Sequence, residues 1–294
     1  MASGALENHE AARAALGASK ATLVWRRLIA DTETPVGAAA KLFESGRGDF
    51  LLESVQGGEV RGRYSLLGLD PDLVFRATGH AAEINRIWRH DRSSFAAVEG
   101  DSLAALRALV ADCRIDDVPA ALPPALACLV GYFGYETIGL VEKLPRAPQS
   151  ALEMPDMLFV RPTIILIFDR LSDELYCISP LWPSSAPVEQ ALASAADRID
   201  AVLHRLSGPV SEPALDATLP EPVLQPVLAP GAYRDMVLRA KDYITAGDIF
   251  QVVLAQRFTC PFPLPPMALY RSLRRINPSP FLYFLDMPGF ALTG

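Results

Sequence analysis

The chain has 294 residues, enough for one large or two ordinary domains with a sizeable hydrophobic core. Half of the residues are hydrophobic, 21% are charged and the net charge is −7, which is typical of a soluble globular protein and argues against a nucleic-acid-binding surface. Its four cysteines lie far apart, residues 1–20 lack the basic-then-apolar order of a secretory signal, and no apolar run reaches the roughly 18–20 residues that span a bilayer. We therefore expect a cytoplasmic protein without disulfides or membrane helices.

Residues 1–20 predict a loose tail or a frayed helix. From 21 to 182, short apolar runs alternate with turn residues, which predicts an antiparallel β region with few helices. Pro35 suits the first turn of one helix, and Asp101 suits the N-terminal cap of another. The expected strands are 23–31, 49–54, 63–68, 73–78, 82–88, 125–130, 157–169 and 175–178, and the expected helices are 36–43 and 103–110.

The composition changes after residue 182. Residues 188–206 are rich in alanine and carry apolar side chains at helical spacing, which predicts an amphipathic helix. Residues 208–230 contain six prolines and have no helical or strand period, so they predict an extended linker. We therefore divide the chain into a tail at 1–20, a domain at 21–182, a helix and linker at 183–229, and the start of a second domain at 230–294.

The segment after the linker predicts a helix and then a central strand. Apolar residues from Tyr233 to Ile244 recur at a helical period, and Gly247 follows them as a left-handed cap. Residues 249–258 carry apolar side chains on both faces, which is typical of a strand covered on both sides. Gln251 lies within this run. A buried amide without a partner costs roughly 1–3 kcal/mol, so Gln251 is either paired structurally or directed into a site.

The last segment predicts a helix at 267–275 and an apolar hairpin made of 281–285 and 290–293. Arg271, Arg274 and Arg275 have the spacing of an ordinary solvated helix face. An apolar hairpin needs further strands and a covering layer, and about 65 residues beyond the linker are too few to supply both. We therefore expect the chain to be truncated within its second domain.

Three stretches carry a family resemblance. They are Leu-Leu-Glu-Ser at 51–54 followed by Arg-Tyr-Ser at 63–65, the stretch 246–258 around Gln251, and Asn-Pro-Ser-Pro-Phe-Leu-Tyr-Phe at 277–284. Together they resemble component I of anthranilate synthase, a chorismate-utilising enzyme. The resemblance covers residues from about 21 to 294 apart from the linker. It implies an α+β fold of two packed antiparallel β-sheets flanked by helices, with a tryptophan-binding regulatory domain at 21–182 and an incomplete chorismate-binding catalytic domain at 230–294.

The resemblance also implies a lyase reaction, the first step of tryptophan biosynthesis. Ammonia from a glutamine amidotransferase subunit attacks the chorismate ring, and pyruvate is eliminated to leave anthranilate. The implied assembly is a heterotetramer, and Mg²⁺ binds the substrate carboxylate through ligands that lie beyond Gly294, so we assign no metal ligand in this chain. Related enzymes that add water carry Lys in place of Gln251. A desolvated Lys can act as a general base, whereas ammonia needs only orientation, so we predict a catalytic role for Gln251.

The same resemblance implies feedback inhibition by L-tryptophan. Glu53 is expected to take the ligand ammonium, and Ser54 its amine or carboxylate. Pro280, Phe281 and Leu282 are expected to present apolar walls and free carbonyls to the indole, in a motif that begins at Asn277. Alone, such a proline motif is more often a plain turn. Arg63 is either a second carboxylate partner or a solvated hairpin residue.

Three alternatives remain open. The first is component I of aminodeoxychorismate synthase, which leads to 4-aminobenzoate and shares the strand that bears Gln251. The second is a binding module that holds tryptophan without turnover, because we expect the truncated chain alone to be inactive. The third is a structural domain in which the motifs are coincidental. Competition between tryptophan and chorismate distinguishes the first alternative from the tryptophan enzyme.

Overall fold

The computed structural model describes residues 6–54, 62–143, 152–210 and 221–294. The chain divides into two compact units, Met1–Glu212 with Pro266–Gly294, and Pro213–Pro265. The structure thus groups the last helix and hairpin with the N-terminal sheet, whereas the sequence-based division placed all of 230–294 together.

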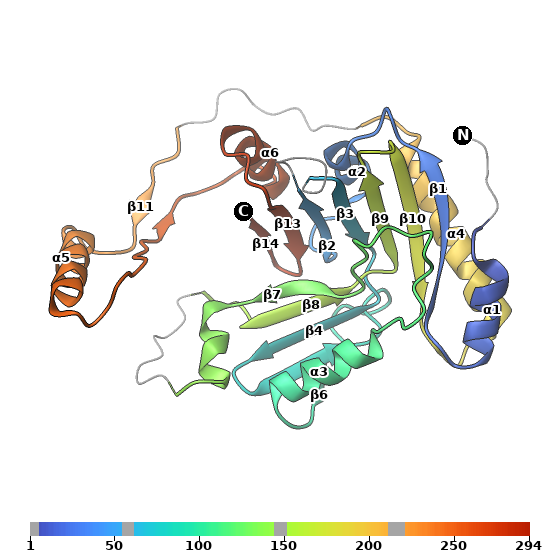
Figure 1. The fold of residues 1–294 in the computed structure, drawn as a ribbon, viewed down its shortest axis with the longest axis horizontal. Helices are drawn as coiled ribbons and strands as arrows, with labels where there is room; N and C mark the ends of the chain where they lie inside the picture. Colours follow the sequence, from blue (N-terminus) through green and yellow to red (C-terminus); the bar gives the residue numbers. More distant parts are fainter. Residues whose placement is uncertain (1–5, 55–61, 144–151, 211–220) are drawn as a thin grey trace. The chain divides into compact units, whose positions relative to one another are not determined.

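The first unit is built on a seven-stranded sheet in which every pairing is antiparallel (Figure 1). Its strands lie in the order β1-β10-β9-β3-β2-β13-β14. Most of them are expected from the alternation of apolar runs and turns. Their bounds are β1 Thr22–Ile29, β2 Asp49–Glu53, β3 Tyr64–Leu69, β9 Ile164–Asp169, β10 Glu174–Leu181, β13 Leu282–Met287 and β14 Phe290–Thr293.

A second, five-stranded sheet has the order β6-β5-β4-β8-β7. Its strands are β4 Leu73–Thr78, β5 Ala81–Asn85, β6 Ala96–Val98, β7 Val130–Phe133 and β8 Met157–Arg161. The prediction of one long strand over 157–169 is wrong, because its two halves belong to different sheets. Pro162 interrupts the run and has no N–H to donate to a ladder, so the chain crosses there from one sheet to the other.

Helices cover the outer faces of the two sheets. Four of them pack their apolar residues against one face of the seven-stranded sheet, and they are α1 His9–Gly17, α2 Pro35–Leu42, α4 Val188–Leu206 and α6 Pro266–Ile276. Helix α3, Ser102–Asp112, packs on the five-stranded sheet. Between the sheets, Phe50 and Leu285 of one meet Val74 and Leu158 of the other. The predicted α+β fold of two packed antiparallel sheets flanked by helices is confirmed.

The expected helix signals are confirmed. The Asp101 carboxylate accepts hydrogen bonds from the backbone N–H groups of Leu103 and Ala104 at the start of α3. Pro35 occupies the first turn of α2. Within the segment predicted as a tail, residues 9–17 form helix α1 and are more ordered than a loose tail, because Ala12 and Leu16 are buried in the core.

The segment between residues 125 and 134 differs from the prediction. The strand predicted at 125–130 is wrong, since the observed strand is only β7. Within β7, Gly131 lies very close to the neighbouring strand, because a Cβ there would lie 1.9 Å from the carbonyl oxygen of Leu158. Only glycine allows β7 to lie this near β8 at that position.

The last hairpin finds its partner in the N-terminal part of the chain. Strand β13 pairs with β2, with Leu282 opposite Glu53 and Leu285 opposite Phe50. Helix α6 covers the other side, with Tyr270 fully buried. The argument that too few residues follow the linker to complete this hairpin is therefore wrong, since β2 and α6 supply the sheet and the cover.

The second unit contains α5, Ala232–Ala246, and a short pairing of β11, Gln225–Pro226, with β12, Phe258–Thr259. Gly247 caps α5 in the left-handed conformation at φ 81°, as predicted. The central strand predicted over 249–258 is wrong. Residues 251–257 form no strand, and Phe250 is 100% exposed. An apolar run becomes a central strand only with neighbours on both edges, and among the described residues this run has only the two-residue pairing with β11.

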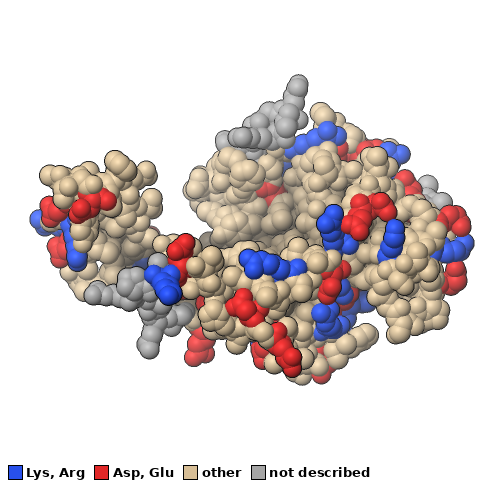
Figure 2. Space-filling view, turned by 60° about the horizontal axis from the view of Figure 1, so that its bottom comes forward, with Lys and Arg blue, Asp and Glu red and all other residues tan. Residues whose placement is uncertain are grey.

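No helix of the described residues is long and apolar enough to cross a membrane. The face of the molecule drawn in Figure 2 carries acidic and basic side chains interspersed over its described residues. It therefore presents no extended surface of one sign there.

Candidate functional site

A cavity of about 420 Å³ lies where the end of β2, the start of β3 and the start of β13 meet. The pairing of Leu282 with Glu53 brings the two predicted tryptophan-site motifs together here, although they are more than 200 residues apart in the chain. The volume falls within the roughly 300–1,000 Å³ of small-molecule sites. The lining residues are Leu52, Glu53, Ser54, Gly62, Arg63, Tyr64, Leu66, Ala125, Phe281, Leu282 and Tyr283.

One face of the sheet supplies the apolar wall. Tyr283 lies opposite Leu52 across β13 and β2, and Leu52 lies opposite Leu66 across β2 and β3. Side chains directly opposite each other on neighbouring strands share a face, so these three form a continuous row. Phe281 lies at the rim, with 73% of its surface exposed.

The polar edge of the cavity is held by a hydrogen bond between the two motifs. The Ser54 hydroxyl donates to the carbonyl oxygen of Pro280 at 3.1 Å. Both residues are exposed enough to exchange this bond for one to a ligand. The cavity therefore combines an apolar wall with a hydroxyl and a carbonyl at its edge, a combination that suits a small amphipathic molecule.

Glu53 is the most strongly bound of the predicted site residues. Its buried carboxylate accepts hydrogen bonds from the Tyr270 hydroxyl at 2.5 Å and from Arg274 at 2.8 and 3.1 Å, and Arg170 lies 3.5 Å away. Burial, and then the bond to Glu53, raise the pKa of Tyr270. These bonds fix the end of β2 to α6. The expected role of Glu53 toward a ligand ammonium stays a prediction.

The interpretation of Arg274 as part of a solvated helix face is wrong, since it pairs with this buried carboxylate. The sequence does contain a signal for it. Tyr270 and Arg274 are four residues apart, so they project from the same face of α6. Only the pairing of β13 with β2 shows that Glu53 lies opposite that face.

Arg63 is ion-paired and so is not a freely solvated hairpin residue. Its guanidinium donates to both carboxylate oxygens of Asp169, at 2.7 and 2.5 Å, and lies over the ring of Tyr64. The hydrogen bond from Arg63 holds the pKa of Asp169 below its ordinary value, and the same bond raises the pKa of Arg63. The pair fixes the start of β3 against the end of β9, and with it the rim of the cavity.

Three predicted residues are not among those that line the cavity. Pro280 contributes only its carbonyl oxygen at the edge, where it accepts the hydrogen bond from Ser54. Asn277 is exposed just after α6, where its backbone N–H donates to the Leu273 carbonyl at 2.9 Å. Gln251 is exposed in the second unit, so the argument from a buried amide does not apply to it. Its catalytic role stays a prediction.

The sequence-based prediction of the site omits Tyr64 and Tyr283, which line the cavity. Both stand within the motifs themselves, and the two-residue period of a strand gives the signal that would have placed them. Among the described residues, no group of three or more His, Cys, Asp or Glu side chains is placed to hold a metal ion.

The sequence is similar to known proteins over most of its length. The sequence profile of the family described as chorismate binding enzyme matches residues 50–294. The chain therefore belongs to the chorismate binding enzyme family.

Within that family, the chain is similar to anthranilate synthase component 1. It is 43% identical over 274 residues to the protein of that name from Cereibacter sphaeroides, with 92% of this chain and 55% of the relative covered. It is 35% identical over 268 residues to that from Thermus thermophilus, with 91% and 54% covered. The crystal structure of anthranilate synthase component I from Streptococcus pneumoniae TIGR4 matches with a TM-score of 0.63 and 25% identity, over 92% of this chain and 57% of that one. The chain spans about half the length of the curated relatives it matches.

Proposed function

We propose that this sequence provides the tryptophan-binding regulatory part of an anthranilate synthase component 1. The observation that carries the proposal is the cavity between β2, β3 and β13. It joins residues from two motifs distant in sequence into one small-molecule site with an apolar wall and a polar edge. The similarity to curated anthranilate synthase components supports it.

In this proposal the indole packs against Phe281, Tyr283 and Leu52, while Ser54 and the Pro280 carbonyl bind the amino-acid end of tryptophan. Glu53 supplies negative charge near the ligand ammonium and fixes the end of β2 through its bonds to α6. Leu282 is buried below the site and keeps β13 in register. Asn277 begins the turn that presents Pro280 and Phe281.

The enzyme activity in this proposal belongs to the whole protein. Chorismate and ammonia give anthranilate, pyruvate and water, in a cytoplasmic heterotetramer with a glutamine amidotransferase subunit that supplies the ammonia. Gln251 orients the ammonia. Mg²⁺ would supply charge stabilisation for the substrate carboxylate, through ligands outside this sequence.

Tryptophan binding tests the proposal directly. The chain contains three tryptophans, so equilibrium dialysis with radiolabelled L-tryptophan is preferable to intrinsic fluorescence. We expect saturable binding by the chain and about 2–12-fold weaker binding by Ser54→Ala, because one neutral hydrogen bond is lost. Phe281→Ala should weaken binding further, since it removes one wall.

The matched control is Tyr135→Ala, which truncates another exposed aromatic residue in the other sheet region. It should bind tryptophan as the unchanged chain does. Absence of saturable binding, or an equal loss in Phe281→Ala and Tyr135→Ala, would contradict the proposed site.

The aminodeoxychorismate synthase alternative predicts a different product. Chorismate, Mg²⁺ and an ammonium salt should give anthranilate fluorescence that L-tryptophan suppresses if the proposal holds for the whole protein. Formation of 4-aminobenzoate without competition by tryptophan would favour the alternative. Tryptophan binding by the chain without any turnover would support the interpretation of this sequence as a binding module.

A further inference from the structure

A second, smaller cavity lies on the helix-covered side of the seven-stranded sheet, where α4 meets the ends of α2 and β3. Its volume is about 150 Å³, and it shares no lining residue with the candidate tryptophan cavity. Four arginines reach it from three parts of the chain, namely Arg47, Arg89, Arg198 and Arg205. Arg198, Ala201 and Arg205 lie three, four and seven residues apart on α4, so they share one face of that helix.

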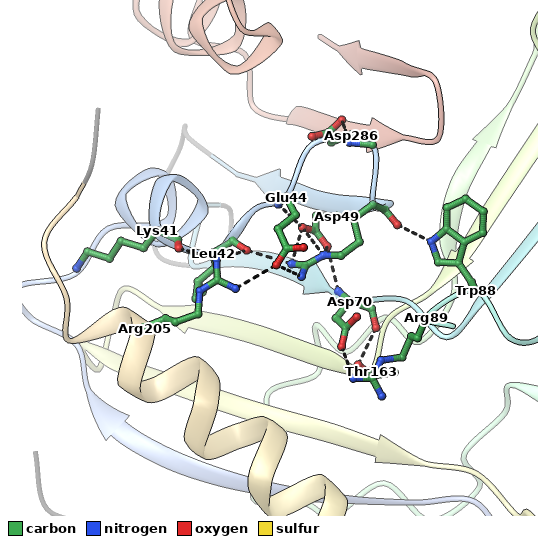
Figure 3. A network of polar contacts seen from close by, with 12 residues as sticks. Lys41, Leu42, Glu44, Asp49, Asp70, Trp88, Arg89, Thr163, Arg205 and Asp286 are labelled. Carbon is green, nitrogen blue, oxygen red and sulfur yellow. Dashed lines mark hydrogen bonds and ion pairs between the residues drawn. The ribbon is translucent and has the colours of Figure 1, made fainter. Parts of the chain in front are cut away.

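Three of these arginines are compensated by carboxylates. The pairs are Arg47 with Asp49 at 2.7 Å, Arg89 with Asp70 at 2.8 Å, and Arg205 with Glu44 at 3.4 Å. Figure 3 shows the last two of these pairs. Figure 3 also shows Arg205 directed toward the backbone carbonyls of Lys41 and Leu42, which hold its guanidinium in place. The cavity wall is therefore built from fixed rather than freely rotating cations.

Arg198 differs from the other three. Among the described residues, no carboxylate lies within 4.0 Å of its guanidinium, and its Nε is buried without a hydrogen-bond partner. Within the described part of the chain, its hydrogen bond is to a neutral group, the Ser179 hydroxyl at 3.0 Å, which itself donates to the Thr163 carbonyl at 3.1 Å. Burial, and then the charge of Arg89, lower the pKa of Arg198, only partly offset by Asp70 and Asp72. A partly buried cation without a close counter-ion is costly.

We propose that this cavity is a binding site for a small tetrahedral oxyanion, inorganic phosphate or sulfate, with Arg198 as its principal ligand and Arg89 and Arg205 beside it. A guanidinium presents parallel N–H donors that match two oxygens of such an anion. The described lining has a net positive charge, because its four arginines face one acidic residue, Asp70, which is already paired with Arg89. The volume is well below the roughly 300–1,000 Å³ of sites for larger metabolites, so the occupant is an inorganic anion.

Equilibrium dialysis of the whole chain against radiolabelled inorganic phosphate, at ionic strength held constant with sodium chloride, tests the site. We expect one saturable site per chain, competition by sulfate, and no effect of added L-tryptophan on its occupancy. Charge-assisted hydrogen bonds of this kind are each worth roughly ten-fold or more in affinity. Arg198→Gln should therefore weaken phosphate binding at least about ten-fold.

A second variant, Ala201→Leu, keeps every charged residue of the cavity and fills part of its volume. Ala201→Leu places a larger side chain at an exposed helical position that lines the cavity, where leucine is a good helix former. It should abolish saturable phosphate binding while the melting temperature stays close to that of the unchanged chain. Arg114→Gln, which removes an arginine 76% exposed elsewhere on the surface, is the control and should bind normally. Phosphate binding no tighter than chloride binding, or unchanged binding in Ala201→Leu, overturns the proposal.

Discussion

Strand β9 and the segment 249–258 are both apolar runs, yet they reach opposite outcomes. Every residue of β9 is buried, and the strand lies between β3 and β10 in the middle of a seven-stranded sheet. The 249–258 segment has Phe250 and Val253 exposed at 100% and 83%, and only its last residue is part of a strand. Apolar composition is common to both, so it does not decide the outcome.

The difference is the supply of neighbours. The backbone N–H and C=O groups of β9 are paired on both edges, and helices and the segment around Leu122 cover its faces. A strand with no partner leaves those groups to water and buries nothing. An apolar run therefore specifies a strand only together with the elements that complete its sheet.

Amide hydrogen exchange should give the largest contrast between the two regions. The amides of β9 should exchange only through global unfolding, whereas those of 251–257 should exchange near the rates of an unstructured chain, a difference of at least about 10³-fold. Exchange measured residue by residue on the whole chain checks this. Comparable protection in the two segments would show that 249–258 has partners that the structure does not give it.

Asp49→Ala should strongly destabilise the sheet that contains β9. The carboxylate is fully buried and accepts from Arg47 and from the backbone N–H groups of Glu44 and Asp70. Its removal leaves Arg47 buried without its closest counter-ion, so we expect a loss of about 3–5 kcal/mol in the free energy of unfolding. Urea denaturation of Asp116→Ala, whose pair with Arg114 is exposed, should show less than about 1 kcal/mol.

Alanine substitutions within the two apolar runs should differ in their effect on the free energy of unfolding. Ile167→Ala removes a side chain that is 0% exposed in β9, so we expect about 2–5 kcal/mol of destabilisation. Val253→Ala removes one that is 83% exposed, so the change should stay within about 0.5 kcal/mol. Chemical denaturation of both variants measures this. Equal losses would mean that the two segments are equally packed.

The smallest expected effect concerns Asp169, the last residue of β9, and its ion pair with Arg63. Arg63 lowers the pKa of Asp169, so the pair stabilises the fold above the ordinary carboxyl pKa of about 3.9, and this contribution is lost as the pH falls through the lower pKa of the folded state. Arg63→Gln should therefore be less stable than the unchanged chain at pH 7, and the difference should shrink in acid. Urea midpoints of both proteins across this range provide the measurement, and a difference independent of pH would contradict the linkage.

Local sequence signals predict most elements of this fold. The helix expected at 188–206 is α4 with the same bounds, because its apolar spacing and its flanking Pro187 and Gly208 are local features. The division of 157–169 between two sheets and the partner of the last hairpin depend on contacts between distant segments. No periodicity within a segment reports such contacts, which is why those two expectations are wrong.

The candidate site follows the same rule. The motifs predict Ser54, Phe281 and Leu282, all of which line the cavity. The register between β2, β3 and β13 brings Tyr64 and Tyr283 to the cavity and pairs Arg274 with Glu53. That register cannot be derived from the sequence. By contrast, only its motif suggests a role for Gln251. The residue is exposed, and the geometry around it gives no support for that role.

The pairing of β2 with β13 also has a consequence for synthesis. Glu53 and Leu282 are 229 residues apart, so at about 5–20 residues per second a ribosome needs roughly 10–50 s to produce the partner of β2 after β2 itself has emerged. During that interval one edge of a largely buried apolar strand has no neighbour, the situation in which nascent sheets aggregate or recruit chaperones. The cavity beside Glu53 forms only when β13 pairs with this edge of β2. A ligand that binds in the cavity would therefore stabilise only those chains whose sheet is complete.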